Sequence, residues 1–273
     1  MKKKIAVFTG GWSFEYAHEV ISGIVEAAEK ENADVFAFIN YSLRWEDTPQ
    51  NEMEFNLFTL PDLNDFDGVI LLGNSFNVEM EKEYFNKVLK DVKVPVIGVE
   101  YEFNGIPSIF TDNYAGMREL VEHIVKEHKV REMLFIGGPE EHMESAERLR
   151  ALLDVAKENG LQMPESNIKY GDWSMRPAME LVNAWMEENN RVPDAVVCAN
   201  DIMALGIMGH LIDRGYKIPE DVIVTGYDCL VYMNDAYPQL ASVSHEWGAM
   251  GAKAVEMLSD MMQGKKRESV LLG

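Results

Sequence analysis

The stretch Gly68-Val69-Ile70-Leu71-Leu72-Gly73 decides the fold, because every position between its two glycines is apolar. A strand that reads as a continuous apolar run has both faces buried, which is typical of a parallel sheet covered by helices on both sides. The next apolar run, Val94-Pro95-Val96-Ile97-Gly98-Val99, has the same character. These two runs predict neighbouring strands of one parallel sheet.

Strand-like and helix-like segments alternate outward from this pair in both directions. Short apolar runs predict further strands at residues 5–9, 35–39, 106–110, 133–136, 168–170, 195–198, 222–225 and 269–272. Helical periodicity predicts helices at residues 14–28, 113–127, 146–158 and 178–188, a long helix that ends at 214, and a last helix at 247–262. One parallel sheet with so many strands would be unusual, so we expect two doubly wound α/β halves that meet near residues 108–112.

Composition places the chain among globular proteins that bind neither DNA nor membranes. Of its 273 residues, 47% are hydrophobic, and the formal net charge is −21. Such an acidic chain repels the phosphate backbone, and it has no apolar run of the roughly 20 residues that a membrane span needs. The N-terminal Lys2-Lys3-Lys4 and the apolar run after it lack a cleavage site, so we expect a cytoplasmic protein. Two cysteines do not make a disulfide framework.

Sequence signatures of catalysis and of cofactor binding are missing. No Gly-x-Gly-x-x-Gly follows the first predicted strand, and no Gly-x-x-x-x-Gly-Lys-Ser/Thr phosphate loop occurs. Six histidines show no metal-ligand spacing, and His123 and His128 are five residues apart on a predicted helix. We therefore expect a binding protein without cofactor or metal, and not an enzyme.

Ligands of open parallel sheets bind outside the carboxyl ends of the strands, so the loops after the strands are the candidate site. They are rich in Gly, Asn and Asp, which ordinary turns and helix caps would also explain. They also contain large aromatic residues that a turn does not need, namely Trp12, Phe14, Phe76 and Trp173.

Several of these segments, taken in order, resemble the effector-binding core of the lac repressor (LacI/GalR) family. The matching motifs are Asp67-Gly68-Val69-Ile70-Leu71-Leu72-Gly73, Asp112-Asn113-Tyr114-Ala115-Gly116, Phe135-Ile136-Gly137-Gly138-Pro139, Ser145-Ala146-Glu147-Arg148-Leu149, Gly171-Asp172-Trp173-Ser174, Ala199-Asn200-Asp201-Ile202-Met203-Ala204-Leu205-Gly206, and residues 218–228. The resemblance implies the fold of type I periplasmic binding proteins, with two lobes joined by three crossovers and a ligand cleft between them. It assigns residues 1–109 and 247–265 to one lobe and 110–246 and 266–273 to the other, and it implies a homodimer.

The resemblance also assigns ligand-binding roles in the second lobe. Arg148 corresponds to an arginine that reaches ligand oxygens, and Asp228 to an acid that accepts hydrogen bonds from ligand hydroxyl or N–H groups. Asn200 offers both a donor and an acceptor, and Trp173 an aromatic face for a flat ligand. Each residue has a structural alternative. Arg148 could be an exposed helix arginine and Asp228 an N-cap aspartate. Asn200 could be a helix cap and Trp173 a buried core tryptophan.

The remaining predicted ligand contacts come from the first lobe and from the return crossover. Trp12, Ser13, Phe14 and Tyr16 occupy the loop after the first strand. Phe76 lies in the loop after the strand that opened this section, and His245 lies where the chain crosses back to the first lobe.

The chain departs from the family pattern at three places. The N-terminal helix-turn-helix is missing, Cys229 stands where a second acid is common, and the sequence stops directly after its final strand. We expect a sensor that binds a small polar molecule and controls an output module outside this chain, either DNA-binding or like a diguanylate cyclase. A sugar is the favoured ligand, ahead of a nucleobase-like molecule. A solute-binding protein of a transporter and a ligand-free dimerisation domain remain as alternatives.

Overall fold

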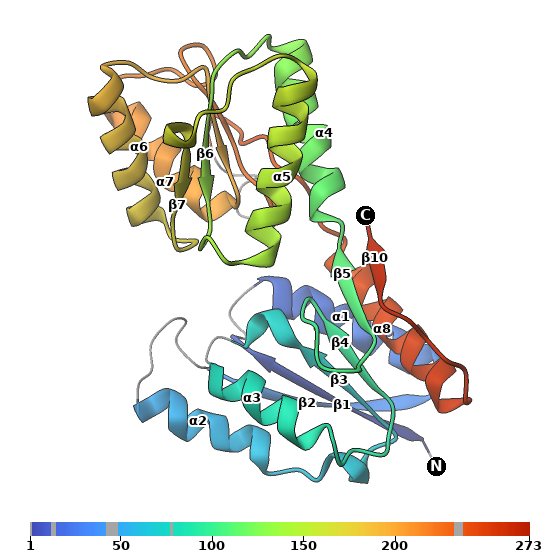
Figure 1. Ribbon diagram of the computed structural model, residues 1–273. Coiled ribbons are helices and arrows are strands. Elements are labelled where there is room, and N and C mark those ends of the chain that lie inside the picture. Colours follow the sequence, from blue (N-terminus) through green and yellow to red (C-terminus); the bar gives the residue numbers. More distant parts are fainter. Residues whose placement is uncertain (1, 12–14, 42–48, 77–78, 232–236) are drawn as a thin grey trace. The chain divides into compact units, whose positions relative to one another are not determined.

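A computed structural model of the chain describes residues 2–11, 15–41, 49–76, 79–231 and 237–273 (Figure 1). The chain divides into two compact units, one made of residues 1–111 and 246–272 and the other of residues 112–245 with Gly273. The first change of unit falls at Thr111–Asp112, within the stretch 108–112 where the sequence predicted the boundary. The expected fold class is confirmed, because each unit is a parallel sheet flanked by helices.

The first unit is built on a six-stranded parallel sheet with the strand order β10-β5-β4-β3-β1-β2. Its strands are β1 (Lys3–Gly10), β2 (Ala33–Asn40), β3 (Gly68–Leu72), β4 (Val96–Val99), β5 (Ser108–Thr111) and β10 (Val270–Leu272). Its helices are α1 (Glu15–Lys30), α2 (Pro49–Thr59), α3 (Glu79–Val88) and α8 (Trp247–Met262), with short 3-10 turns η1 (Leu63–Asp65) and η2 (Gly73–Ser75).

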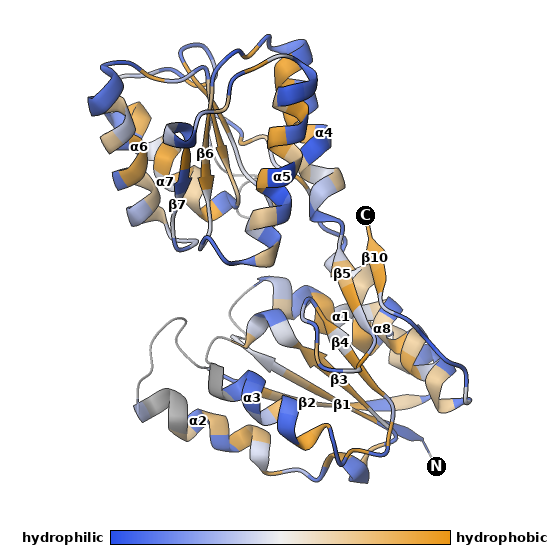
Figure 2. Ribbon diagram, viewed as in Figure 1, coloured by the Kyte–Doolittle hydropathy of each residue, from blue (hydrophilic) through white to orange (hydrophobic). Residues whose placement is uncertain are grey.

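Alternate residues at positions 5–8 of β1 serve two separate cores, which is why this part of the strand is apolar without interruption. Ile5 and Val7 belong to the core shared with α1 and α8. Ala6 and Phe8 belong to the core on the other face, beside the aromatic residues of α2 and α3. Figure 1 shows the same two helical layers, and Figure 2 shows the hydrophobic colouring concentrated on the strands.

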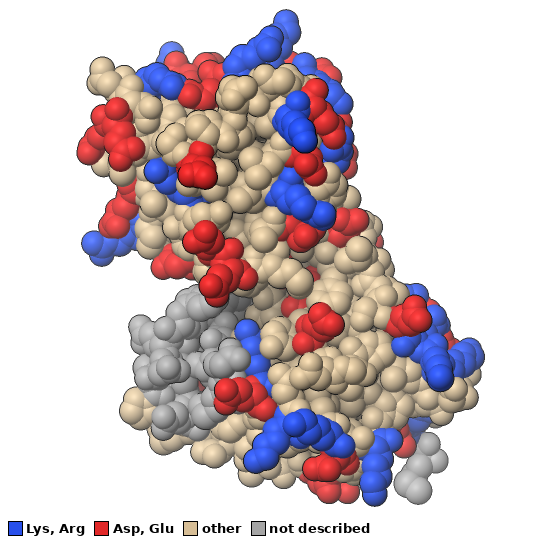
Figure 3. Space-filling view, viewed as in Figure 1, with Lys and Arg blue, Asp and Glu red and all other residues tan. Residues whose placement is uncertain are grey.

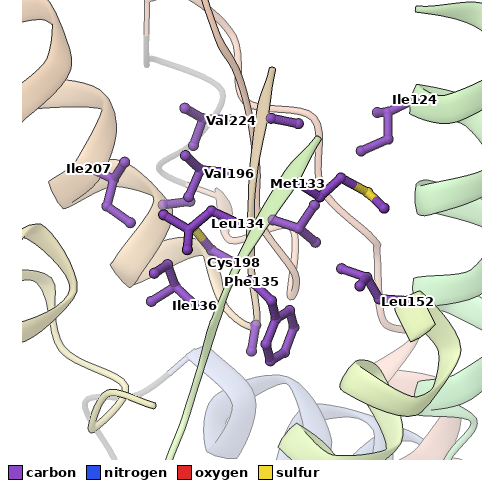
Figure 4. Packing of buried hydrophobic residues seen from close by; sticks show 14 of the residues in the cluster. Ile124, Met133, Leu134, Phe135, Ile136, Leu152, Val196, Cys198, Ile207 and Val224 are labelled. Carbon is purple, nitrogen blue, oxygen red and sulfur yellow. The ribbon is translucent and has the colours of Figure 1, made fainter. Parts of the chain in front are cut away.

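The second unit is built on a four-stranded parallel sheet with the order β7-β6-β8-β9. Its strands are β6 (Met133–Gly137), β7 (Ile168–Tyr170), β8 (Ala195–Cys198) and β9 (Ile223–Thr225). Its helices are α4 (Asn113–Glu127), α5 (Met143–Glu158), α6 (Met175–Asn189) and α7 (Asp201–Asp213), with the turn η3 (Glu165–Asn167) before β7. Strand residues such as Leu134, Phe135 and Val196 are fully buried between the helical layers (Figure 4).

Two features differ from the sequence-based expectation. The final strand was assigned to the second lobe, but β10 pairs in parallel with β5 and so completes the sheet of the first unit. Its apolar residues Val270 and Leu272 pack against the core that also contains Ile109. This packing places the strand in the first unit. Helices α2 and α3 were not predicted: the apolar residues of α2 do not repeat at helical spacing, whereas those of α3 do and were overlooked.

Candidate functional site

The loops after β6, β7, β8 and β9 lie at one edge of the second unit's sheet, because all four strands run in the same direction. This is the edge at which open parallel sheets bind ligands. Side chains from these loops gather around Arg148, which reaches them from α5. The following contacts all lie within the second unit.

The guanidinium group of Arg148 is held by acceptors from three elements. Its Nε donates to Asn113 Oδ1 at 2.8 Å, and its Nη1 donates to the carbonyl oxygen of Ala199. Its Nη2 lies 3.4 Å from Oε2 of Glu144, one helical turn earlier in α5. Arg148 is 3% exposed, which excludes the alternative of a solvent-exposed helix arginine.

Aromatic rings cover the guanidinium plane. The centre of the Tyr227 ring lies 3.8 Å from the guanidinium carbon of Arg148, and that of Trp173 lies 5.9 Å from it. Burial raises the pKa of Tyr227 to about 12, so its hydroxyl stays neutral, and it donates to the backbone carbonyl oxygen of Asn113 at 3.4 Å. A planar cation in contact with aromatic faces is restricted in its orientation, which favours a site that recognises ligand geometry.

Trp173 depends on a glycine for its position. A side chain at Gly138 would begin 2.2 Å from an atom of the Trp173 ring system, so only glycine fits there. The ring of His142 packs edge-on against Trp173, with centroids 5.0 Å apart. Trp173 itself is half-buried and has a positive φ of 69°. It is thus not a fully buried core tryptophan.

Asp228 lies beside Arg148 on a strained backbone segment. Its Oδ1 is 3.8 Å from Nη1 of Arg148 and 3.3 Å from Nε2 of His245. Asp228 has a φ of 112° and Cys229 has a φ of 51°, values that non-glycine residues rarely adopt. Such strain persists only where surrounding contacts hold it, and it is concentrated at functional sites.

Three consecutive backbone N–H groups secure this segment. That of Asp228 donates to the carbonyl of Val243 at 2.9 Å, and that of Cys229 donates to Oγ of Ser242 at 3.0 Å. The N–H of Leu230 donates to Oδ2 of Asp201 at 2.9 Å. The first turn of α7 therefore supports the loop that carries Asp228.

Asp201 is the most perturbed acid of this cluster. Its side chain is fully buried and accepts a hydrogen bond from Oγ of Ser242 at 2.6 Å, in addition to the one from Leu230. Burial raises the pKa of Asp201 to about 6, and the charge of the nearby Asp228 acts in the same direction.

Asn200 is the N-cap of α7, the structural alternative weighed for it. Its Oδ1 accepts from the N–H of Met203 at 2.9 Å, and its Nδ2 donates to the carbonyl of Trp173 at 3.1 Å. One amide proton and one lone pair remain after these two bonds. A ligand contact by Asn200 stays a prediction.

The predicted residues of the first unit are placed differently. Trp12, Ser13 and Phe14 lie outside the described residues. The ring of Tyr16 packs edge-on against Trp247, with centroids 5.8 Å apart. Phe76 departs from its predicted role, because it is 2% exposed and its ring stacks on Phe85 within the aromatic core of its own unit.

Reasoning from the sequence thus indicated five residues that the second unit brings into one cluster: Arg148, Trp173, Asn200, Asp228 and His245. It missed Asn113, Glu144, Asp201 and Tyr227 as members of the site. A usable signal existed only for Glu144, because a residue four positions before an arginine on a helix lies on the same face.

The cluster offers a buried cation, carboxylate and carbonyl acceptors, an amide and aromatic faces, which is the equipment for recognising a small polar molecule. Among the described residues, no group of His, Cys, Asp and Glu side chains could hold a metal ion. Within the same part of the chain, no helix is long and apolar enough to cross a membrane.

Two parallel α/β units, one of them with a polar and aromatic cluster at its strand ends, define a protein of the periplasmic-binding type. The chain belongs to the periplasmic binding protein-like domain family, whose sequence pattern matches residues 121–271. The resemblance to LacI-family regulators is confirmed by the comparisons that follow.

Among curated proteins, the chain is similar to catabolite control protein A of Staphylococcus aureus, with 30% identity over 204 residues. That match includes 74% of this chain and 59% of the relative, so this chain matches little more than half of the relative's length.

Among solved structures, the chain is similar to the transcriptional regulator CelR in complex with cellobiose, with a TM-score of 0.79 and 22% identity over 98% of this chain and 80% of that chain. It is also similar to a LacI-family regulatory protein from Chloroflexus aggregans, with a TM-score of 0.78 and 23% identity over 98% of this chain and 94% of that chain. At these identities, the structural likeness supports the fold alone.

Proposed function

We propose that this chain is the effector-binding part of a transcription regulator and that it binds a small, hydroxyl-rich molecule, most simply a sugar, at the Arg148 cluster. One observation carries the proposal. The Arg148 guanidinium is buried at the carboxyl edge of a parallel sheet, beside the rings of Tyr227 and Trp173 and within 4 Å of two carboxylates. Burying a cation and its carboxylate partners costs desolvation free energy that their attraction often does not recover, so stability alone does not account for the cluster.

The relatives support the sensing role and the kind of ligand. One similar structure is a transcriptional regulator that holds cellobiose, and the curated relative is a control protein. We further propose for this chain a role without catalysis and control of an output module. A homodimeric assembly and a cytoplasmic location are part of the same proposal. Of the two modules expected, the DNA-binding one fits these relatives better than the cyclase-like one.

A ligand changes the conformation of such a sensor only through its different affinities for two states of the chain. The strained segment at Asp228 and Cys229 is the element of this site best suited to have two arrangements. The N–H of Asp228 bonds to a backbone carbonyl, but those of Cys229 and Leu230 bond to side chains. Ligand contact with Asp228 would therefore reach α7 through Asp201.

Thermal unfolding against a panel of sugars, sugar phosphates, nucleosides and amino acids tests this proposal. A ligand at 100 times its dissociation constant adds about 2.7 kcal/mol to stability, which raises the melting temperature by several degrees in a protein of this size. We expect one class, sugars, to produce the shift. We expect Arg148→Lys and Asp228→Asn to abolish it.

The matched control is Arg150→Lys, since Arg150 lies on the same helix with a side chain that is 58% exposed. Folding of each variant is checked by circular dichroism. A shift that survives in both Arg148→Lys and Asp228→Asn would place the ligand elsewhere. A panel in which nucleosides alone act would keep the site but replace the ligand class.

A further inference from the structure

Glu144 belongs to the cluster, but the proposed function does not say how its charge affects the choice of ligand. It lies in the first turn of α5, and its Oε2 is 3.4 Å from Nη2 of Arg148. Its side chain is 13% exposed, so the carboxylate is drawn inward and is not a solvated surface charge.

The nitrogens of Arg148 already face acceptors of this chain. Nε is bound to Asn113, Nη1 faces the carbonyl of Ala199 with Asp228 close by, and Nη2 faces Glu144. Carboxylates and phosphates bind arginine best through two parallel N–H donors on one edge of the fork. The two terminal nitrogens, Nη1 and Nη2, have Asp228 and Glu144 beside them, so an anionic ligand that uses both nitrogens would compete with these carboxylates.

The charges around the guanidinium also oppose an anion. Glu144 and Asp228 lie within 4 Å of the single cation, and buried Asp201 adds a third carboxylate through its contact with the loop of Asp228. The imidazoles of His245, 3.3 Å from Asp228, and of His142, against Trp173, are further basic groups among the described residues of the cluster. Oxygen acceptors therefore dominate the cluster, and a ligand that enters it must bring hydrogen-bond donors.

We propose that Glu144 selects the ligand by charge, so that this site takes a neutral polyhydroxyl molecule or one that carries an amine, and rejects its phosphorylated or carboxylated counterpart. This inference rests on the proposed function. Hydroxyl and ammonium groups donate to the carboxylates of Glu144 and Asp228, whereas a phosphate or carboxylate has no proton to donate to them and adds a like charge beside them.

Matched ligand sets test the inference. Each set keeps one sugar ring and changes its charge: glucose, glucosamine, glucose 6-phosphate and glucuronate, with galactose, ribose and their phosphates as further sets. Thermal unfolding screens them, and calorimetric titration gives the dissociation constants. We expect wild-type protein to bind the anionic member of any recognised set at least tenfold more weakly than the neutral or amino member.

The variant Glu144→Gln keeps the shape and one acceptor oxygen but removes the charge. We expect it to reduce that discrimination at least tenfold by strengthening the binding of the anionic member. Glu147→Gln is the matched control, because Glu147 lies three residues further along α5 and pairs with exposed Arg150. We expect it to leave the ratio of the two affinities unchanged, which separates selection by charge from a general effect on the helix.

Two results would overturn the inference and leave the proposed function standing. One is a wild-type protein that prefers an anionic member, and the other is a Glu144→Gln variant in which both members change by the same factor. Binding to no member of any set, by wild type and variant alike, would instead contradict the proposed function.

Discussion

At the scale of single residues, the site is held together by buried polar groups whose partners come from distant parts of the chain. Arg148 on α5 is bound by Asn113 of α4 and by the carbonyl of Ala199 after β8. Asp201 at the start of α7 holds the loop after β9. Removing one member of such a network leaves the others buried without partners, which costs more than the bond itself is worth.

Asp201 gives this network a pH dependence. Its pKa is about 6 in the folded chain, against an ordinary value of 3.8. Between these values the folded state binds more protons than the unfolded state, so the group's contribution to stability is fully present below pH 4 and is lost as the pH rises through 6. In urea unfolding, the free energy of unfolding of wild type should fall by on the order of 1 kcal/mol between pH 5 and pH 7, relative to that of Asp201→Asn.

The exposed Asp213→Asn, at the other end of α7, is the control for that comparison. Its unfolding free energy should follow that of wild type across the same pH range. Parallel curves for wild type and Asp201→Asn would show that Asp201 does not have a raised pKa in the folded chain.

At the scale of elements, helices α1 and α8 approach so closely that their backbones touch. A side chain at Gly23 would begin 2.0 Å from the carbonyl oxygen of Gly248, and one at Gly251 would begin 2.1 Å from that of Val20. These obstacles are backbone atoms, which cannot rotate away as a side chain does. The two helices can pack at this distance only because glycine occupies both positions.

Gly23→Ala should therefore destabilise the chain by about 3 kcal/mol, because the added methyl group forces the helices apart. Gly209→Ala provides the matched comparison in α7, where the same methyl group would meet nothing within 4 Å. We expect the free energy of unfolding of that variant to rise by about 0.5–1 kcal/mol, because alanine reduces the conformational entropy of the unfolded chain. Chemical denaturation of both variants measures the difference, and equal effects of the two substitutions would contradict the close approach.

The sequence allowed most elements to be predicted, because buried parallel strands must be apolar on both faces. The stretch at residues 68–73 and its neighbour at 94–99 are strands, as expected. Helix α2 was missed since its apolar residues do not share one face, as the 67% exposure of Met53 illustrates. The partner of β10 could not be predicted, because strand pairing depends on contacts between residues about 160 positions apart.

The candidate site was predicted less completely than the fold. Resemblance to a known family pointed to Arg148 and Asp228, and the structure places them 3.8 Å apart. The roles of Asn113 and Asp201 depend on hydrogen bonds to residues 35 and 29 positions away, which no local pattern reveals. The prediction for Phe76 was wrong, because an aromatic residue directly after a strand can pack in the hydrophobic core as readily as it can contact a ligand.

At the scale of the whole molecule, the second unit is one continuous stretch of chain apart from Gly273, whereas the first unit combines residues 1–111 with residues 246–272. The hydrophobic core of the second unit, from Met117 to Tyr227, draws only on residues of that stretch. The surface of the chain mixes charges of both signs on the face drawn in Figure 3, within a formal net charge of −21.

A fragment of residues 112–245 should consequently fold without the remainder of the chain. We expect a cooperative thermal transition, and a near-ultraviolet circular dichroism signal from buried Trp185 that disappears in the same transition. A matched fragment of residues 1–111, which lacks α8 and β10, should show no cooperative transition. Failure of the first fragment to fold would mean that its core depends on residues outside the stretch.

The central claim is that a small molecule is recognised at Arg148, and nuclear magnetic resonance of arginine Nε–H groups tests it most directly. The Arg148 signal is assigned by its loss in Arg148→Lys, and the full chain is titrated with the sugar that stabilises it. We predict that the Arg148 Nε–H signal shifts with the same dissociation constant as the stabilisation, while the signal of exposed Arg150 stays in place. A sugar that stabilises the chain and leaves the Arg148 signal unchanged would contradict the account.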